Sequence, residues 1–357
     1  MMLLDQILEQ IRPVDPEWVR AADRRQSQLT KPPGSLGRLE EIANRCAAIR
    51  ETFSITAGRP RIVLFAADHG VCAEGVSPYP QAVTAQMVAN FLRGGAAINA
   101  LAHAGAIDLQ VVDVGVAAPL PASSGLVSRK VAAGTRNFCE GPAMTEAQLL
   151  AALHTGIELA CEAASAGCDV LGFGEMGIGN TTAAAAIAAA LTGGSVEAVV
   201  GRGAGADDQC LARKISAVRR ALALHSAHFR GPLDILARVG GFEIAAMCGF
   251  CLGASARRLP VVTDGFIATA AAALAARLHP GAADYLFAAH LSVEPGHRRL
   301  LAALGQEPLL SLGMRLGEGT GAALAIQLIR AAVAAFTGMA TFASAGVSGP
   351  EGGEVPA

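Results

Sequence analysis

Short apolar runs alternate with longer helix-like stretches along most of the chain, beginning near residue 61. Most of the short runs carry apolar residues on both faces, which is typical of strands buried on both sides of a sheet. We expect strands at residues 61–67, 109–114, 126–132, 168–171, 196–200, 259–263 and 285–289. We expect helices between them, at residues 81–103, 145–166, 183–191, 208–224, 242–257 and 267–278.

Repeated strand–helix units of this kind predict an α/β fold: an open parallel sheet with helices on both faces, Rossmann-like. Two helical regions, 3–50 and 319–336, fall outside the alternation and are expected to form a small helical subdomain. Asp15 followed by Pro16 predicts a helix start within the first region. The expected organisation is N-terminal helices of the small subdomain at 1–58, a parallel α/β domain with the ligand site at 59–310, a loop with Glu318 and a C-terminal helix at 311–340, and a disordered tail at 341–357.

A glycine-rich segment, residues 172–182, separates the fourth of these strands from an alanine-rich helix. A strand, a glycine turn and a helix N-terminus together present free backbone N–H groups to an anion. Asn180, Thr181 and Thr182 add side-chain donors at the helix start. Glu175 is unexpected in such a segment, because a carboxylate repels phosphate. The pattern predicts a ligand with a phosphate at one end and hydroxyls or a cationic centre nearby; a tight turn with no ligand is the alternative.

Polar groups follow five of the expected strands. They are Asp68-His69-Gly70, Asp113 with Gly115, the 172–182 segment, Asp264-Gly265, and His290 with Ser292. Ligands of open parallel sheets lie outside the carboxyl ends of the strands, so we expect these groups to converge on one crevice. Each group alone is common turn chemistry, and the inference depends on their number.

Composition narrows the function classes. The 357 residues are 52% hydrophobic with a net charge of −2, and the interspersed charges argue against nucleic acid as a partner. No apolar stretch of about 18 residues lacks a glycine, proline or polar interruption, and the N-terminus lacks the basic region of a signal peptide. The eight histidines and eight cysteines show no metal-ligand spacing, and Cys248 and Cys251 read as a reduced, buried pair. We expect a cytoplasmic protein with no metal, no cofactor and no membrane partner.

Glu318 lies between two glycines at the start of the long C-terminal helix. One interpretation is an ordinary first-turn acid that interacts with the helix dipole, with Arg315 as its surface partner. The flanking Gly317 and Gly319 favour another, in which something must approach the carboxylate closely.

Together these motifs resemble those of the nicotinate-nucleotide–dimethylbenzimidazole phosphoribosyltransferases. The matching segments, in family order, are KPPGSLGRLE at 31–40, ADHGV at 67–71, GEMGIGNTT at 174–182, VGGF at 239–242, DGF at 264–266, HLS at 290–292 and RLGEGTGA at 315–322. The resemblance implies transfer of the phosphoribosyl group of nicotinate mononucleotide to 5,6-dimethylbenzimidazole with inversion at C1′. The products would be α-ribazole 5′-phosphate and nicotinate, in assembly of the cobalamin nucleotide loop. The resemblance also implies a homodimer.

The chemistry can be checked against these residues. The pyridinium leaves with the bonding electrons and becomes neutral, so the reaction needs no general acid and no metal. The attacking base gains positive charge, so an ordinary carboxylate can take the proton from its other N–H. The resemblance assigns that role to Glu318, and contact with ribose or developing oxocarbenium charge to Glu175 and Asp264. It implies further nucleotide-binding positions at Gly177, Gly179, Asn180, Thr181, Thr182, Gly203, Lys214, Gly265 and Ser292.

The implied base pocket comprises Tyr79, Met87 and Leu316. The enteric pattern has a Ser and a Gln beside the base, where this sequence aligns Tyr79 and Met87. A shift of one residue would point to Gln86 instead. An aromatic ring and a thioether favour a flat apolar ligand and leave the preferred base open.

Other interpretations remain beside this one. A nucleotide-dependent oxidoreductase would need a Gly-x-Gly-x-x-Gly turn after the first strand, where this chain has Asp68-His69-Gly70. A noncatalytic phosphosugar-binding or regulatory protein would leave Glu318 without a role. The proline- and glycine-rich segment 31–38, bracketed by two cations, fits either a structural connector or a lid near an anionic ligand, in this subunit or in a neighbouring one.

Overall fold

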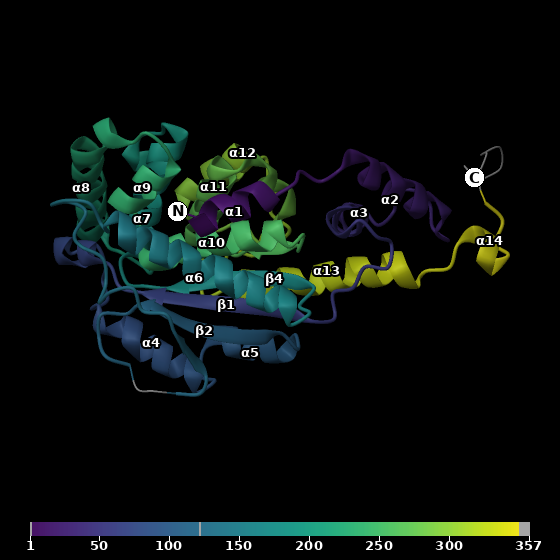
Figure 1. The fold of residues 1–357 in the computed structure, drawn as a ribbon, viewed down its shortest axis with the longest axis horizontal. Coiled ribbons are helices and arrows are strands. Elements are labelled where there is room, and N and C mark those ends of the chain that lie inside the picture. Colours follow the sequence, from purple (N-terminus) through teal and green to yellow (C-terminus); the bar gives the residue numbers. More distant parts are fainter. Residues whose placement is uncertain (1, 121–122, 350–357) are drawn as a thin grey trace.

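The computed structural model describes residues 2–120 and 123–349 (Figure 1). One sheet of six parallel strands has the order β3-β2-β1-β4-β5-β6, which is the strand order of a doubly wound dinucleotide-binding fold. The strands are β1 (Pro60–Ala67), β2 (Asp108–Gly115), β3 (Leu126–Ser128), β4 (Val170–Met176), β5 (Val261–Thr263) and β6 (Leu286–Ala288). The prediction of an open parallel α/β sheet is confirmed.

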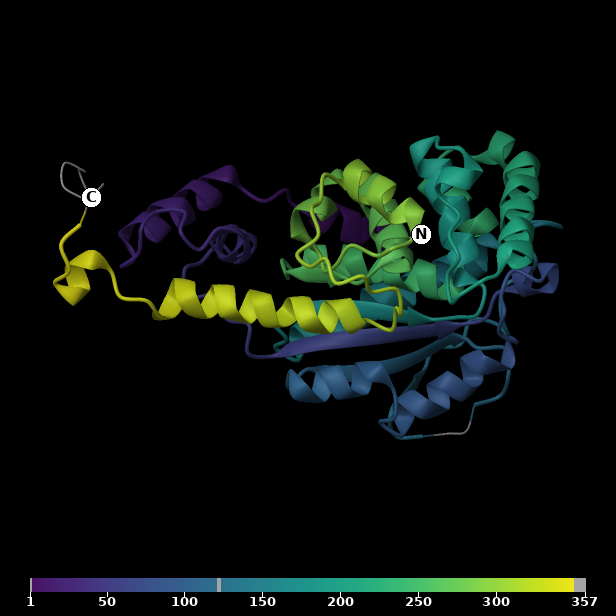
Figure 2. The same cartoon turned by 180° about the vertical axis from the view of Figure 1, so that it is seen from behind.

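Helices cover both faces of the sheet (Figures 1 and 2). One face carries α4 (Ala82–Leu92), α5 (Ala97–Ala104) and α13 (Thr320–Gly338). The other carries α6 (Glu146–Ser165), α10 (Phe242–Ala256) and α11 (Phe266–Leu278). Around α11 pack α7 (Asn180–Thr192), α9 (Pro232–Val239) and α12 (Pro295–Leu304), and α8 (Asp208–His225) packs against α7.

β4 extends further than expected, which places Glu175 on a strand and not in a loop. One side of the strand faces α13, and a Cβ at Gly174 would collide with the backbone of Gly319 at the start of that helix. Phe173 points to the opposite face and packs edge-on against Phe250 of α10, with ring centroids 6.0 Å apart. The glycines at this end of β4 therefore let α13 begin directly against the sheet. The glycine turn, expected at residues 172–182, is limited to residues 177–179, between β4 and α7.

Several other elements differ from their expected form. Residues 196–200 form a short 3-10 helix (Val196–Ala198) and not a strand, since so short an apolar run does not distinguish the two. The helix expected at 81–103 is interrupted near Gly94, whose φ is +79°. α9 and α12 were not predicted, although each starts with a proline in its first turn.

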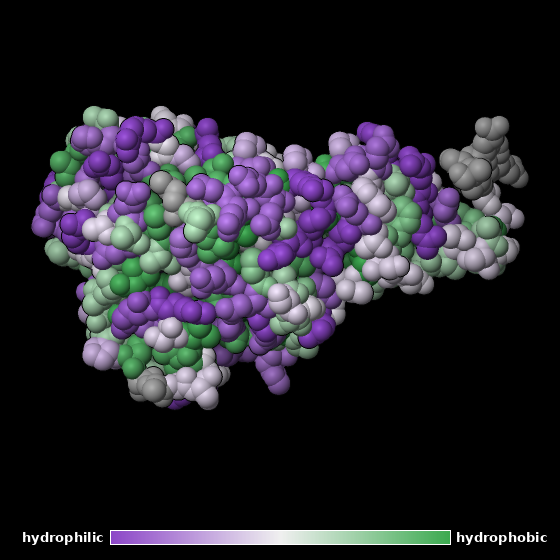
Figure 3. All heavy atoms as spheres, viewed as in Figure 1, coloured by the Kyte–Doolittle hydropathy of each residue, from purple (hydrophilic) through white to green (hydrophobic). Residues whose placement is uncertain are grey.

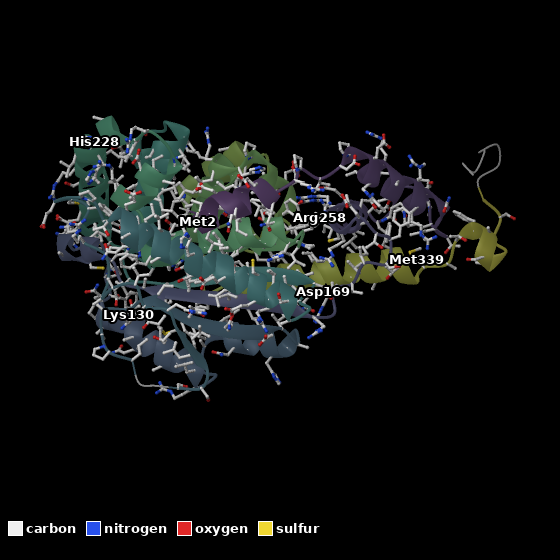
Figure 4. All side chains as sticks on the ribbon, viewed as in Figure 1. Met2, Lys130, Asp169, His228, Arg258 and Met339 are labelled. Carbon is white, nitrogen blue, oxygen red and sulfur yellow. The ribbon has the colours of Figure 1, made fainter. Side chains whose placement is uncertain are left out.

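A helical arm extends beyond the sheet, on the right of Figure 1. It combines α2 (Pro16–Gln28), α3 (Arg38–Arg50) and the far end of α13, with a backbone bridge between Leu29 and Thr341. Arg258, labelled in Figure 4, donates to the carbonyls of Ala48 (3.2 Å) and Ile49 (2.9 Å) and so fastens α3 to the main body. α1 (Met2–Gln10) differs from the expected grouping, because it packs on α6 and α10.

The C-terminal segment contains more structure than expected. A short helix, α14 (Phe342–Ala345), lies within the region expected to be disordered, and residues 350–357 of that region lie outside the described residues. The surface seen in Figure 3 mixes polar and apolar residues. Among the described residues, α13 is the helix long and apolar enough to cross a membrane by length and composition alone, and half of its apolar window is buried within the protein.

Candidate active site

A cavity of ≈ 670 Å³ opens at the carboxyl ends of β4, β5 and β6, as expected for a sheet of this topology. Its wall also includes residues of α4, the start of α7 and the segment before α13. A second hollow of ≈ 740 Å³ lies between α2 and the end of α13, and its described lining residues include Arg24 and Arg25 but no acid. The first hollow combines acids, hydroxyls and free backbone at the strand ends, and we take it as the candidate site.

Most of the residues singled out from the sequence meet in this cavity. The lining includes Tyr79, Met87, Glu175, Gly177, Asn180, Thr181, Gly203, Gly265, Ser292, Leu316 and Glu318. Four others, Gly179, Thr182, Lys214 and Asp264, lie behind the wall.

The first two strand ends do not reach the cavity, contrary to expectation. Asp113 accepts hydrogen bonds from the amides of Gly115 (3.0 Å) and Val116 (2.8 Å), so its carboxylate shapes the turn after β2. Its other oxygen lies 3.3 Å from Nζ of Lys130, which is labelled in Figure 4. Asp68 caps the same turn by accepting from the amide of Ala117 at 2.7 Å. Through these contacts both carboxylates stabilise the turn after β2.

Glu175, near the end of β4, is almost completely buried. One carboxylate oxygen accepts a hydrogen bond from the side-chain amide of Asn180, and a Cβ at Gly317 would collide with the other. Burial raises the pKa of Glu175 well above its usual value, and the negative charges of Glu243 and Asp264 raise it further. A cationic ligand beside this carboxyl group would favour its ionised form.

Glu318 occupies an unusual backbone conformation. Its φ is +64°, between Gly317 (+86°) and Gly319 (+85°), and a non-glycine residue in this region costs on the order of 1–3 kcal/mol. The side chain is 5% exposed, and its Oε2 has no hydrogen-bond partner among the described residues. Burial raises the pKa of this carboxyl group, partly opposed by the backbone N–H of Ile98. Such strain and such an unpaired group are typical of a functional residue.

Asp264 contacts the backbone that directly follows Glu318. One carboxylate oxygen accepts from the amide of Gly319 (3.1 Å), the other from those of Gly321 (2.7 Å) and Ala322 (3.1 Å). Asp264 therefore caps α13 and fixes the backbone beside Glu318. This position differs from the expected contact with ribose, because both oxygens are engaged and Asp264 does not line the cavity.

Lys214 links the first turn of α7 to the loop that contains Gly201. Its buried Nζ donates to Thr181 Oγ1 and to the carbonyl of Gly201, each at 2.9 Å. Burial lowers its pKa, and the nearby Glu294 opposes that shift. The amide of Gly203 donates to Glu294 Oε1 at 2.8 Å, so a buried acid and a buried base together fix this loop.

Comparison with known proteins identifies the family. A family model described as phosphoribosyltransferase matches residues 11–347. The chain is 55% identical to the nicotinate-nucleotide–dimethylbenzimidazole phosphoribosyltransferase of Chloroflexus aggregans, over 98% of this chain and 99% of that one. The chain belongs to this phosphoribosyltransferase family. The Geobacter metallireducens member is 52% identical over 97% of this chain and 98% of its own length. The crystal structure of the Thermus thermophilus member superposes with a TM-score of 0.89 at 53% identity, covering 94% of this chain and all of that one.

The two residues that the sequence alignment left open for the base pocket lie differently with respect to the cavity. Met87 lines the cavity, whereas Gln86 is exposed and does not. Tyr79 and Leu316 lie at the cavity mouth with exposed fractions of 50% and 57%. These side chains, with Val83, belong to the apolar part of the wall.

The sequence analysis missed Glu294 and Glu243, and it considered Arg315 only as a surface partner of Glu318. Glu294 and Arg315 both line the cavity, and Glu294 lies just beyond a motif that was recognised. Glu243 is fully buried in α10, with its Oε1 2.5 Å from Nε2 of His69. A Cβ at Gly177 would lie 3.4 Å from that imidazole, so the pair sits directly beneath the glycine turn. The sequence did not predict the position of Glu243, because a single acid in an apolar run does not indicate a buried partner.

Two further features bear on the sequence analysis. Among residues 2–120 and 123–349, no group of three or more His, Cys, Asp or Glu side chains could hold a metal ion.

The 31–38 segment does not line the cavity. Arg38 donates to the carbonyls of Pro308 (2.6 Å) and Glu307 (3.1 Å). Lys31 pairs with Glu40 at 2.7 Å. Within one chain, this segment acts as a connector.

Proposed function

We propose that the chain transfers the phosphoribosyl group of nicotinate mononucleotide to 5,6-dimethylbenzimidazole, with inversion at C1′. The products are α-ribazole 5′-phosphate and nicotinate. The observation that carries the proposal is the position of Glu318, a strained and buried carboxylate in a cavity wall that has one apolar part and one polar part. The names of the relatives support the choice of substrates.

The polar part of the cavity suits the nucleotide. The turn containing Gly177 leads into the N-terminus of α7, where the helix dipole favours phosphate. Thr181 and Gly203 line the same part, with Lys214 behind them. We assign ribose and the cationic ring to Glu175, whose ionised form a neighbouring positive charge stabilises. Gly265 and Ser292 complete the nucleotide side.

The apolar part, which includes Tyr79, Met87 and Leu316, suits a flat heterocycle. Its free nitrogen attacks C1′ as the bond from C1′ to the pyridinium nitrogen breaks, and that nitrogen keeps the electron pair. Glu318 takes the proton from the other nitrogen of the base, which prevents positive charge from accumulating there. Asp264 serves this step indirectly by fixing the backbone next to Glu318.

The wider role follows from the same proposal. The product is the lower-ligand nucleotide of cobalamin, so the reaction belongs to assembly of the nucleotide loop. We propose that the protein works in the cytoplasm as a homodimer, and that neither nucleic acid nor a membrane takes part. The partner's copy of the 31–38 segment is a candidate neighbour of the cavity.

The test is to mix the protein with nicotinate mononucleotide and dimethylbenzimidazole and to follow nicotinate release chromatographically. The anomeric proton of the isolated product, measured by NMR, reports the configuration at C1′, and we expect the α-anomer. Omission of the base is the control and should stop release. Absence of release with both substrates, or a β-configured product, would contradict the proposal.

A further inference from the structure

Arg315 is a charged residue of the cavity wall for which the reaction above gives no role. Among the described lining residues, the acids are Glu175, Glu294 and Glu318, and Arg315 is the one lysine or arginine. A nucleotide phosphate that enters this cavity therefore meets one guanidinium and three carboxyl groups, and each carboxyl group repels it when ionised. The guanidinium is the group in the wall that can offset that repulsion directly.

The guanidinium of Arg315 has spare hydrogen-bonding capacity. Its Nη1 donates to the carbonyl of Gly203 over 3.3 Å, a long contact, and the structure shows no carboxylate paired with it among the described residues. Arginine carries several more N–H donors in a planar fork that matches phosphate oxygens. The side chain is exposed, so a ligand can reach it.

The contact with Gly203 places the guanidinium at the phosphate end of the cavity. A Cβ at Gly203 would lie 3.0 Å from Thr181 Oγ1 and 3.1 Å from Lys214 Nζ, so these donors adjoin the same loop. Lys214 approaches from behind the wall, whereas Arg315 comes from the segment before α13. A phosphate between them would be held from two sides.

We propose that Arg315 binds the 5′-phosphate of the nucleotide and makes the site selective for nucleotides over nucleosides. The inference rests on the proposed function. In the free protein, Arg315 is held near the phosphate position by the Gly203 carbonyl. On binding, its fork turns to the phosphate oxygens. The competing explanation is that Arg315 only fastens one loop to the other.

A cycle of two enzymes and two substrates separates these explanations. Wild type and Arg315→Met are compared with nicotinate mononucleotide and with nicotinate riboside, which lacks the phosphate. We expect kcat/KM for the mononucleotide to fall roughly tenfold to a hundredfold in the variant, as for loss of a charge-assisted hydrogen bond. For the riboside we expect a change of less than about twofold, because the lost contact involves only the phosphate. Arg315→Lys, which keeps the charge without the fork, should recover part of the loss.

Inhibition constants give the same answer without riboside turnover. The constant for ribose 5-phosphate should rise in Arg315→Met, and that for nicotinate should not. Arg219→Ala, which removes an exposed arginine paired with Glu197 outside the cavity lining, is the charge-matched control and should leave both constants unchanged. Equal losses for phosphate-bearing and phosphate-free ligands would overturn the inference in favour of loop fastening, as would no loss at all. Failure of the proposed function would instead show as no nicotinate release by the wild type.

Discussion

Glu175 and Glu318 are two versions of one local arrangement, a carboxylate among glycines just before an apolar helix, yet they are held in different ways. Glu175 belongs to β4 and pairs in register with Phe65 of the neighbouring strand. Glu318 follows no strand, and its left-handed backbone is held by the carboxylate of Asp264. The sheet fixes one acid through many backbone bonds, whereas the other depends on the Asp264 side chain and on the hydrogen bonds from Thr320 to the carbonyl of Gly317. Position is therefore robust at Glu175 and fragile at Glu318.

The electrostatic surroundings of the two acids also differ. The pKa of Glu175 is raised well above its usual value, because burial is reinforced by Glu243 and Asp264. The pKa of Glu318 is raised less far, by burial and by the neighbouring charge of Asp264. A carboxyl group that ionises more readily is better suited to accept a proton at neutral pH. A group whose ionisation awaits a positive neighbour is better suited to bind a cationic substrate.

The largest effect is expected from exchanging each acid for its amide. Glu318→Gln should lower kcat by about 10²–10⁴-fold with little change in KM for the mononucleotide, since only proton removal is lost. Glu175→Gln should act mainly on KM for the mononucleotide, since an amide cannot balance the pyridinium charge. Steady-state kinetics with each substrate varied in turn measure both. If both variants lost only kcat, the two acids would not have the separate roles that their surroundings indicate.

A smaller effect is expected when the support of Glu318 is weakened. Asp264→Ala leaves the amides of Gly319, Gly321 and Ala322 without an acceptor. We expect kcat to fall more than mononucleotide affinity, and the free energy of unfolding to fall by about 1–3 kcal/mol. Loss of the Asp264 charge should also move the acid limb of the pH–rate profile to lower pH, because that charge raises the pKa of Glu318.

Chemical denaturation and pH–rate profiles check the Asp264→Ala variant. Asp113→Ala, which breaks a comparable turn away from the cavity, is a suitable control. It should cost stability without moving the pH profile. A profile that did not move in Asp264→Ala would show that Asp264 and Glu318 are not electrostatically coupled.

The asymmetry between the two acids also explains what the sequence could predict. Alternating apolar runs identified the sheet and most helices, because burial on both faces leaves a clear pattern. The glycines around both acids were visible as motifs. The direction of the Asp264 side chain could not be predicted, since a carboxylate in a turn after a strand can face either a ligand or backbone amides. Glu243 was hidden because its partner, His69, is distant in the sequence and nothing in an apolar helix signals a buried pair.

The smallest effect concerns stability, and it has opposite sign to the loss of activity. Folding raises the pKa of the Glu175 carboxyl group. At a pH above the usual value of 4.5, the unfolded chain has therefore released a proton that the folded protein still holds. The contribution of this group to stability is therefore favourable at low pH and falls as pH rises through the folded-state value.

Replacing Glu175 with Gln removes the ionisable group, and with it this loss of stability at neutral pH, and keeps an acceptor for Asn180. We expect a higher melting temperature than wild type near neutral pH and no gain in acid. The gain in the free energy of unfolding should be about 1.4 kcal/mol for each pH unit between the usual pKa and the folded-state pKa or the pH of the measurement, whichever is lower. Glu318→Gln should gain less, since its pKa is raised less. Thermal unfolding of the three proteins across this pH range measures the order, and a larger gain for Glu318→Gln would reverse the electrostatic comparison between the two acids.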